Sequence, residues 1–191
     1  PWYHNIKSIF TIHNIQYQGM YGWEVNTECV GIPPAETRLL EQDGKLNMVK
    51  GAIETATRVT TVSPSYANEI LDPWFSHGLD TILRNRQYKL CGILNGIDNA
   101  SYDPATDYQL YRNYTADDMS GKAECKRALQ ERLGLAQRGD IPIISMVSRM
   151  VQHKGLDLVR MTLDEIMCGH DVQFVILGSG DKEYEDFFRH M

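Results

Sequence analysis

Short apolar runs alternate with segments of helical period along most of the chain. The apolar runs are rich in β-branched residues and predict strands at residues 6–12, 58–62, 89–94, 141–147 and 172–177. Apolar residues three and four positions apart predict helices at residues 45–56, 63–70, 121–133 and 156–167, with a last helix after residue 181. Strands that alternate with helices in this way are typical of βαβ units, so we expect an α/β fold with doubly wound parallel sheets.

Signals at the ends of these segments support the assignment. Ser63 and Pro64 are the residue types preferred at the N-cap and the first position of a helix. Gly134 is placed to end the helix before it. Residues 141–147 are almost continuously apolar, which predicts a parallel strand buried on both faces. Residues 16–43 have no steady period and predict mostly loop with short helical pieces.

A polar segment divides the chain. Residues 98–115 are rich in Tyr, Asp and Asn and show little periodicity, which indicates a linker. We therefore expect two parallel sheets, one on each side of it. The predicted organisation is a Rossmann-like domain over residues 1–102, a linker and connecting helix over residues 103–139, and the first part of a second Rossmann-like domain over residues 140–191.

Composition narrows the class of protein. A hydrophobic share of 42% suits a globular protein with a real core, and no run reaches the roughly 18 apolar residues of a membrane span. The net charge of −6, with both signs interleaved, argues against binding to nucleic acid or to an anionic membrane. The four cysteines are scattered, which favours free, mostly buried thiols over disulfides or a zinc site. The first residue is not Met and the last lies in a helical pattern, so we expect a piece of a longer chain.

Polar residues follow each predicted strand. In a doubly wound sheet, ligands bind beyond the carboxyl ends of the strands. The residues at those ends are His13-Asn14, Ser63-Pro64, Asn95 to Asp98, Ser148-Arg149 and Gly178-Ser179-Gly180. Several such ends across two sheets indicate a shared cleft.

The chemistry of these positions has more than one interpretation. Arg149 and Lys154 stand beside a predicted helix N-terminus and could bind a phosphate. Alternatively, Arg149 could pair with a nearby carboxylate and Lys154 could be solvated. The glycines of the 178–180 turn could let the backbone approach a phosphate or could form a simple tight turn. His13 alone is more often structural than catalytic, and Asn95-Gly96 is a common turn dipeptide. His77, His153 and His170 have no metal-ligand spacing with carboxylates or thiols, so we assign no metal.

Four stretches at these same places resemble motifs of the bacterial glycogen synthases and plant starch synthases, in that family's order and spacing. They are Thr11-Ile-His-Asn-Ile-Gln-Tyr-Gln-Gly19, Arg58-Val-Thr-Thr-Val-Ser-Pro64, Gly92-Ile-Leu-Asn-Gly-Ile-Asp98, and Ser148-Arg149 with His153-Lys-Gly-Leu-Asp-Leu-Val159. Asp43 to Asn47 and Leu177 to Asp181 also fit. The resemblance runs from about residue 7 to the end and is weakest at residues 25–40 and 99–120.

The resemblance implies two Rossmann-like domains that face a cleft, the GT-B arrangement, with residues 1–102 on the acceptor side and residues 140–191 on the nucleotide-sugar side. It implies a retaining transfer of glucose from ADP-glucose to the non-reducing end of an α-1,4-glucan, without a metal or other cofactor. Arg149 and Lys154 would hold the donor diphosphate. His13 would lie by the donor sugar, close to the anomeric centre and its 6-hydroxyl, and would be catalytic together with Arg149 and Lys154. Asn14 and Asn95 would line the cleft, with Gly178, Ser179 and Gly180 near the nucleotide.

Other interpretations stay open. Another GT-B enzyme, such as a sucrose or trehalose-phosphate synthase, is the nearest rival, and a non-catalytic glucan-binding or scaffolding relative is the rival from another class. The family's K-x-G-G-L loop and its glutamate segment E-P-C-G-L have no counterpart in these residues, so we expect the chain by itself to be inactive. The resemblance fits a bacterial cytoplasm, or the plastid stroma for a plant protein.

Overall fold

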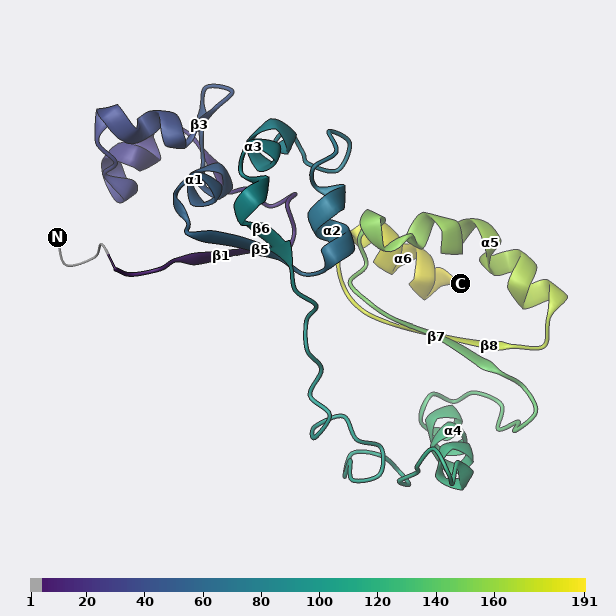
Figure 1. The fold of residues 1–191 in the computed structure, drawn as a ribbon. Helices are drawn as coiled ribbons and strands as arrows, with labels where there is room; N and C mark the ends of the chain where they lie inside the picture. The colour runs from purple at the N-terminus through teal and green to yellow at the C-terminus, as the bar shows by residue number, and fades with distance from the viewer. Residues whose placement is uncertain (1–4) are drawn as a thin grey trace. The chain divides into compact units, whose positions relative to one another are not determined.

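The computed structural model describes residues 5–191, which divide into two compact units, one ending at Ile97 and the other beginning at Asp98 (Figure 1). Their parallel strands form two separate sheets, as the sequence predicts. The boundaries predicted for the domains at residues 102 and 139 remain predictions.

The first unit is built on a parallel sheet in the order β1-β5-β6. Strand β1 spans Ile9–Ile12, β5 spans Arg58–Thr61 and β6 spans Leu90–Gly92. In the register, Thr61 pairs with Ile12 on one side and with Gly92 on the other. The carboxyl ends of all three strands are therefore level, and the loops that follow them leave from one edge of the sheet.

Helices cover this sheet. They are α1 (Met48–Thr55), α2 (Pro64–Glu69) and α3 (Asp80–Asn85), with a 3₁₀ turn at Gln87–Lys89. Their apolar residues join those of the strands in one core, whose buried members are Ile12, Ile15, Ile53, Ala56, Val59, Ile70, Leu79 and Leu83. The helix predicted at Ser63 is confirmed, because the Ser63 side chain accepts a hydrogen bond from the backbone N–H of Tyr66 at 2.9 Å.

The sequence prediction missed a small antiparallel sheet in the same unit. Strands β2 (Met20–Tyr21), β3 (Glu41–Gln42) and β4 (Lys45–Asn47) form it in the order β2-β4-β3. The helix predicted from residue 45 is therefore wrong for its first three residues and begins at Met48. Between β2 and β3 lie a π-helical turn at Asn26–Val30 and a 3₁₀ helix at Pro34–Leu39, in agreement with the short helical pieces expected there.

The second unit has a two-stranded parallel sheet of β7 (Ile143–Val147) and β8 (Gln173–Leu177). Helices α4 (Ser120–Arg132), α5 (Leu156–Gly169) and α6 (Lys182–His190) follow the predicted pattern, with a 3₁₀ turn at Gln152–Lys154. Helix α4 is tied to the sheet, because the Gln130 side chain, 1% exposed, donates a hydrogen bond to the Gln173 side chain at 2.8 Å.

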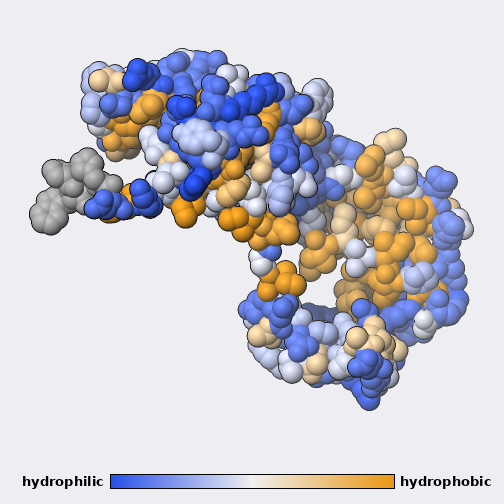
Figure 2. Space-filling view, in the orientation of Figure 1, coloured by the Kyte–Doolittle hydropathy of each residue, from blue (hydrophilic) through white to orange (hydrophobic). Residues whose placement is uncertain are grey.

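Two expectations about burial are wrong. Strand β7 is not buried on both faces: Val147 is 74% exposed, and Leu177 beside it on β8 is 66% exposed. Within residues 98–191 the sheet has two strands, so much of its apolar surface has no covering layer, and Figure 2 shows hydrophobic residues at the surface there. The cysteines are free, but Cys29, Cys91 and Cys168 are exposed rather than buried.

Candidate functional site

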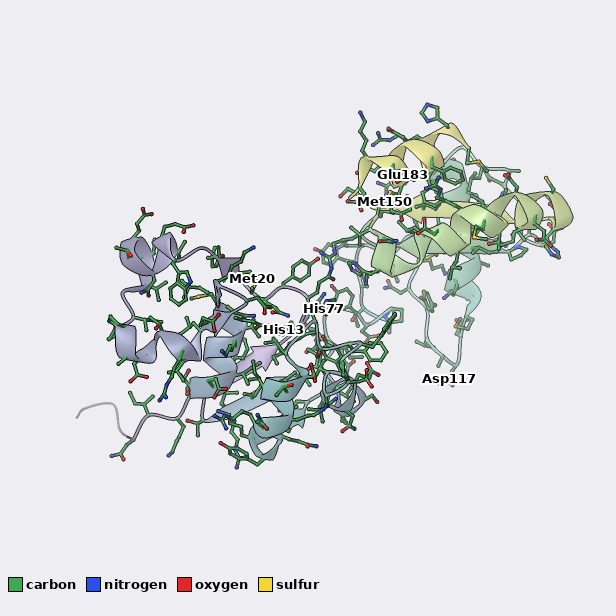
Figure 3. The ribbon with its side chains drawn as sticks, turned by 90° about the horizontal axis from the view of Figure 1, so that it is seen from above. His13, Met20, His77, Asp117, Met150 and Glu183 are labelled. Atoms are coloured by element: carbon green, nitrogen blue, oxygen red, sulfur yellow. The ribbon has the colours of Figure 1, made fainter. Side chains whose placement is uncertain are left out.

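His13 is the first residue after β1 and lies between two buried side chains. Ile12 is 3% exposed and Ile15 is 2% exposed, and both belong to the core of the first unit, whereas His13 itself is exposed (Figure 3). The core thus fixes the backbone on either side of the histidine and leaves the imidazole accessible. This placement fits a residue that meets a ligand.

Asn14 shapes the turn that follows. Its side-chain oxygen accepts a hydrogen bond from the backbone N–H of Gln16 at 2.9 Å, and its carbonyl accepts one from the N–H of Tyr17 at 3.2 Å. This is an Asx turn. The side-chain oxygen of Asn14 therefore already accepts one hydrogen bond within the loop, and both N–H groups of its amide are left to meet a ligand.

Asn95 lies beyond β6, at the same edge of the sheet as His13. The backbone N–H of Ile93 donates to the carbonyl of Thr61 at 2.7 Å, which carries the pairing with β5 one residue past β6. Asn95 follows two residues later and is exposed. Because β5 separates the two strands, β1 and β6 are roughly 10 Å apart. The sequence prediction that His13 and Asn95 share one carboxyl edge is in agreement with this topology.

Arg149 and Lys154 lie in the loop between β7 and α5. Both are exposed, and among residues 5–191 neither side chain has an ion-pair or hydrogen-bond partner. The loop itself is anchored, because Met150 is 7% exposed and Leu156 is completely buried in the core of the second unit. The interpretation in which Arg149 pairs with a neighbouring carboxylate is therefore not supported, and both cations are available to an anion.

The helix that begins after this loop adds to the attraction for an anion. Helix α5 starts at Leu156 with Gly155 as its N-cap, in the left-handed region at φ 74°, and no side chain caps it. Uncapped N–H groups and the helix dipole favour negative charge. The Asp157 carboxylate in the first turn opposes this attraction, and it accepts a hydrogen bond from the Tyr184 hydroxyl at 3.1 Å. Burial raises the pKa of Tyr184, and the hydrogen bond to Asp157 raises it further.

The Gly178–Gly180 turn packs directly on the Arg149 loop. A Cβ at Gly178 would lie 1.9 Å from the carbonyl oxygen of Ser148, and one at Gly180 would lie 2.3 Å from that of Met150. The backbone N–H of Gly180 donates to the Glu185 carboxylate at 2.8 Å. These glycines are thus required by backbone packing, and the N–H of Gly180 already has a partner. The tight-turn interpretation explains Gly178 and Gly180, which leaves Ser179 as the member whose side chain could reach a ligand.

A pocket of about 490 Å³ lies beside this turn, between β8, α5 and α6. Its lining is mainly apolar and includes Met150, Leu163, Met167, Phe174, Ile176 and Phe188, but neither Arg149 nor Lys154. Its chemistry therefore resembles an uncovered core rather than a site for a charged donor. Within the part of the chain that the structure describes, no group of three or more His, Cys, Asp or Glu side chains is placed to hold a metal ion. No helix there is long and apolar enough to cross a membrane.

The structure adds two residues that the sequence prediction missed. The Tyr66 hydroxyl accepts a hydrogen bond from the backbone N–H of Ile15, and the Glu185 carboxylate holds the turn at Gly180. Tyr66 is 51 residues from Ile15 in sequence, so no local pattern reports this contact. Glu185 reads in the sequence as an ordinary solvated residue of an amphipathic helix.

Comparisons with known proteins identify the class first. The chain matches the catalytic domain of starch synthase IV from Arabidopsis thaliana, solved with ADP and acarbose, with a TM-score of 0.87 and 33% identity. The match covers 100% of this chain and 42% of that one. The fold is therefore the α/β fold of the GT-B class of glycosyltransferases, as the resemblance implied.

Sequence comparison finds similar proteins of the same class. A family model described as the starch synthase catalytic domain matches residues 1–85. The whole chain is 42% identical to the glycogen synthase of Bacillus subtilis (strain 168) and 47% identical to that of Bacillus anthracis. The chain is thus similar in sequence to glycogen synthases and to the starch synthase catalytic domain. It spans 40% of the length of these two relatives.

Proposed function

We propose that this chain is part of a retaining glucosyltransferase of the glycogen and starch synthase type. The donor is ADP-glucose and the acceptor is the non-reducing end of an α-1,4-glucan, glycogen or starch. The observation that carries the proposal is the pair of cations Arg149 and Lys154, exposed and without partners among residues 5–191, beside the uncapped N-terminus of α5. Glycogen synthases that match the whole chain, and a matching starch synthase solved with ADP, support the donor class.

The chemistry explains why fixed cations belong at this position. Breaking the bond between a sugar and a diphosphate leaves positive charge on the sugar and negative charge on the departing ADP. Arg149 and Lys154 stabilise that negative charge more in the transition state than in the ground state, which is the requirement for catalysis. They thereby supply the charge that a bound metal supplies in other nucleotide-sugar enzymes.

His13 is the third catalytic residue, and the other site residues bind and orient. His13, exposed at the end of β1, lies by the donor sugar. The amide groups of Asn14 and Asn95, on the same sheet edge, donate to sugar hydroxyls. Ser179 lies near the nucleotide, while Gly178 and Gly180 hold the turn against the Arg149 loop. The homologues identified in bacteria favour a bacterial cytoplasm, and a plant protein of this kind would act in the plastid stroma.

The test is an activity assay of the full-length protein with ADP-glucose and glycogen, followed as release of ADP and growth of the glucan. We expect turnover with ADP-glucose, and none from a polypeptide limited to these 191 residues. Binding of glycogen without turnover would instead identify a non-catalytic relative. Transfer to fructose or glucose 6-phosphate, but not to glucan, would identify a sucrose or trehalose-phosphate synthase. Either result would overturn the proposal.

A further inference from the structure

The turn after β1 is held from outside by one side chain. The backbone N–H of Ile15 donates to the hydroxyl oxygen of Tyr66 at 3.0 Å, and Tyr66 belongs to α2, the helix that follows β5. The contact therefore joins the loops that leave two neighbouring strands, β1 and β5. His13 is two residues from the anchored N–H, with Asn14 between them.

The anchored group needs a partner. The Ile15 residue is 2% exposed, and a buried backbone N–H is almost always hydrogen-bonded in native proteins. Among residues 5–191, the acceptor of the Ile15 N–H is the Tyr66 hydroxyl. The backbone N–H of Ile15 cannot turn to another acceptor without a shift of the loop, because its side chain is fixed in the core.

Tyr66 is itself well placed to hold a fixed position. Its own backbone N–H donates to the Ser63 side chain at 2.9 Å, which caps the helix, and its ring packs on the core that contains Ile15. The cap at Ser63 and the packing of the ring thus fix the position of Tyr66 at the end of β5. The Asx turn of Asn14 determines the local conformation of the loop, and the hydrogen bond to Tyr66 determines the position of the loop relative to α2.

We propose that Tyr66 is a positioning residue for His13: its hydroxyl, through the Ile15 N–H, sets the place of the imidazole at the carboxyl edge of the sheet. This rests on the proposed function, in which His13 lies by the donor sugar. The Tyr66 hydroxyl acts through the backbone and does not touch substrate. The contribution is made at the reacting end of the donor, whereas Arg149 and Lys154 hold its diphosphate.

The kinetic test is Tyr66→Phe in the full-length protein, which removes one oxygen and keeps the ring in the core. We expect kcat to fall by about tenfold to a hundredfold, with KM for ADP-glucose within about twofold, because a small displacement of a catalytic group slows chemistry more than it weakens binding. The matched control is Tyr88→Phe: Tyr88 is 75% exposed, and its hydroxyl has no hydrogen bond within residues 5–191. The control should leave both constants unchanged.

A second variant separates positioning from simple stability. If Tyr66 acts through His13, then adding Tyr66→Phe to His13→Ala should leave kcat within about twofold of the single His13→Ala value, because the two changes remove the same effect. A residue that only stabilises the fold would lower activity by the same factor in both backgrounds. That outcome would overturn the proposal, as would an unchanged kcat in Tyr66→Phe.

Hydrogen exchange provides a readout that does not depend on the reaction. In Tyr66→Phe the amide hydrogens of residues 13–18 should exchange faster than in the wild type, and in Tyr88→Phe they should not. Equal exchange rates in the wild type and Tyr66→Phe would show that the hydroxyl does not hold the loop. If the wild type transfers no glucose, the proposed function fails, and the exchange rates still decide whether Tyr66 anchors the turn.

Discussion

Met150 and Gly180 form a parallel bridge just beyond β7 and β8, so the two strands remain joined after the sheet itself has ended. The N–H of Asp181 donates to the Met150 carbonyl at 2.7 Å, and the N–H of Met150 donates to the Ser179 carbonyl at 2.9 Å. Arg149 is the neighbour of Met150 and is therefore carried by this bridge. The glycine turn and the Arg149 loop act as one structural piece.

We predict that Gly180→Ala destabilises the second unit and weakens donor binding together. The added Cβ would lie 2.3 Å from the Met150 carbonyl oxygen, and a backbone neighbour cannot move aside as a flexible side chain can. The backbone shift that makes room for the added Cβ should lower the free energy of unfolding by about 1–3 kcal/mol. Gly139→Ala is the control, because its Cβ would meet no atom within 4 Å. Thermal unfolding and the KM for ADP-glucose measure the two effects, and equal behaviour of both variants would show that the bridge tolerates a side chain.

Lys89 gives a prediction for the first unit. The Lys89 residue is 5% exposed, and its ammonium group donates to the carbonyls of Glu54 at 3.1 Å and Ala56 at 2.7 Å, where α1 ends. Burial lowers the pKa of Lys89, the neighbouring Arg86 lowers it further, and Glu54 partly opposes the shift. Between the lowered pKa and the ordinary value of 10.5, the unfolded chain therefore binds more protons than the folded one.

The free energy of unfolding should accordingly rise with pH through that window, by at most about 1.4 kcal/mol per pH unit from this group. Lys89→Met removes the titrating group, so its stability should not show this rise. Urea unfolding of the wild type and Lys89→Met from about pH 8 to 10 measures the difference, with the exposed Lys45→Met as control. A wild-type advantage that stays constant or shrinks as pH rises would contradict the assignment.

The sequence predicts the parallel strands and most helices because their signals are local. The cap at Ser63 and the left-handed Gly134, at φ 67°, were both readable from residue type. The hairpin of β3 and β4 was also readable in principle: Asp43 and Gly44 have positive φ at 51° and 76°, as an Asp-Gly turn requires, but the helical spacing of residues 45–56 masked it.

In the candidate site, too, the sequence pattern predicts features with a local signal and misses contacts between distant residues. The pattern singled out His13, Asn95 and Arg149 as candidates because each lies just after a predicted strand, and it added Lys154 because that residue precedes a predicted helix. It could not identify the Tyr66 contact, which joins residues distant in sequence. Nor could it show that Gly178 and Gly180 are required by the backbone of the loop after β7. The apolar pattern of β7 indicates that the strand can be buried on both faces. It does not show whether other segments cover it, and residues 98–191 leave part of its apolar surface exposed.

The proposed function depends most on Arg149 and Lys154. If both stabilise the departing diphosphate, replacement of either by Ala in the full-length protein should lower kcat by about a hundredfold, equivalent to roughly 3 kcal/mol of barrier. Lys154→Arg should not restore full activity, because a planar guanidinium places its donors differently from an ammonium. The double variant should lose less than the product of the two single losses, since both groups act on one leaving group.

The most direct measurement is kcat and KM for ADP-glucose in Arg149→Ala and Lys154→Ala, each at low and at high ionic strength. If the two cations stabilise the departing diphosphate, both variants will show a large loss of kcat that persists when salt is added. If the two residues are surface cations that only attract the donor, kcat will stay at the wild-type value and the rise in KM will fade with salt. An unchanged kcat in both variants would exclude a catalytic role for Arg149 and Lys154.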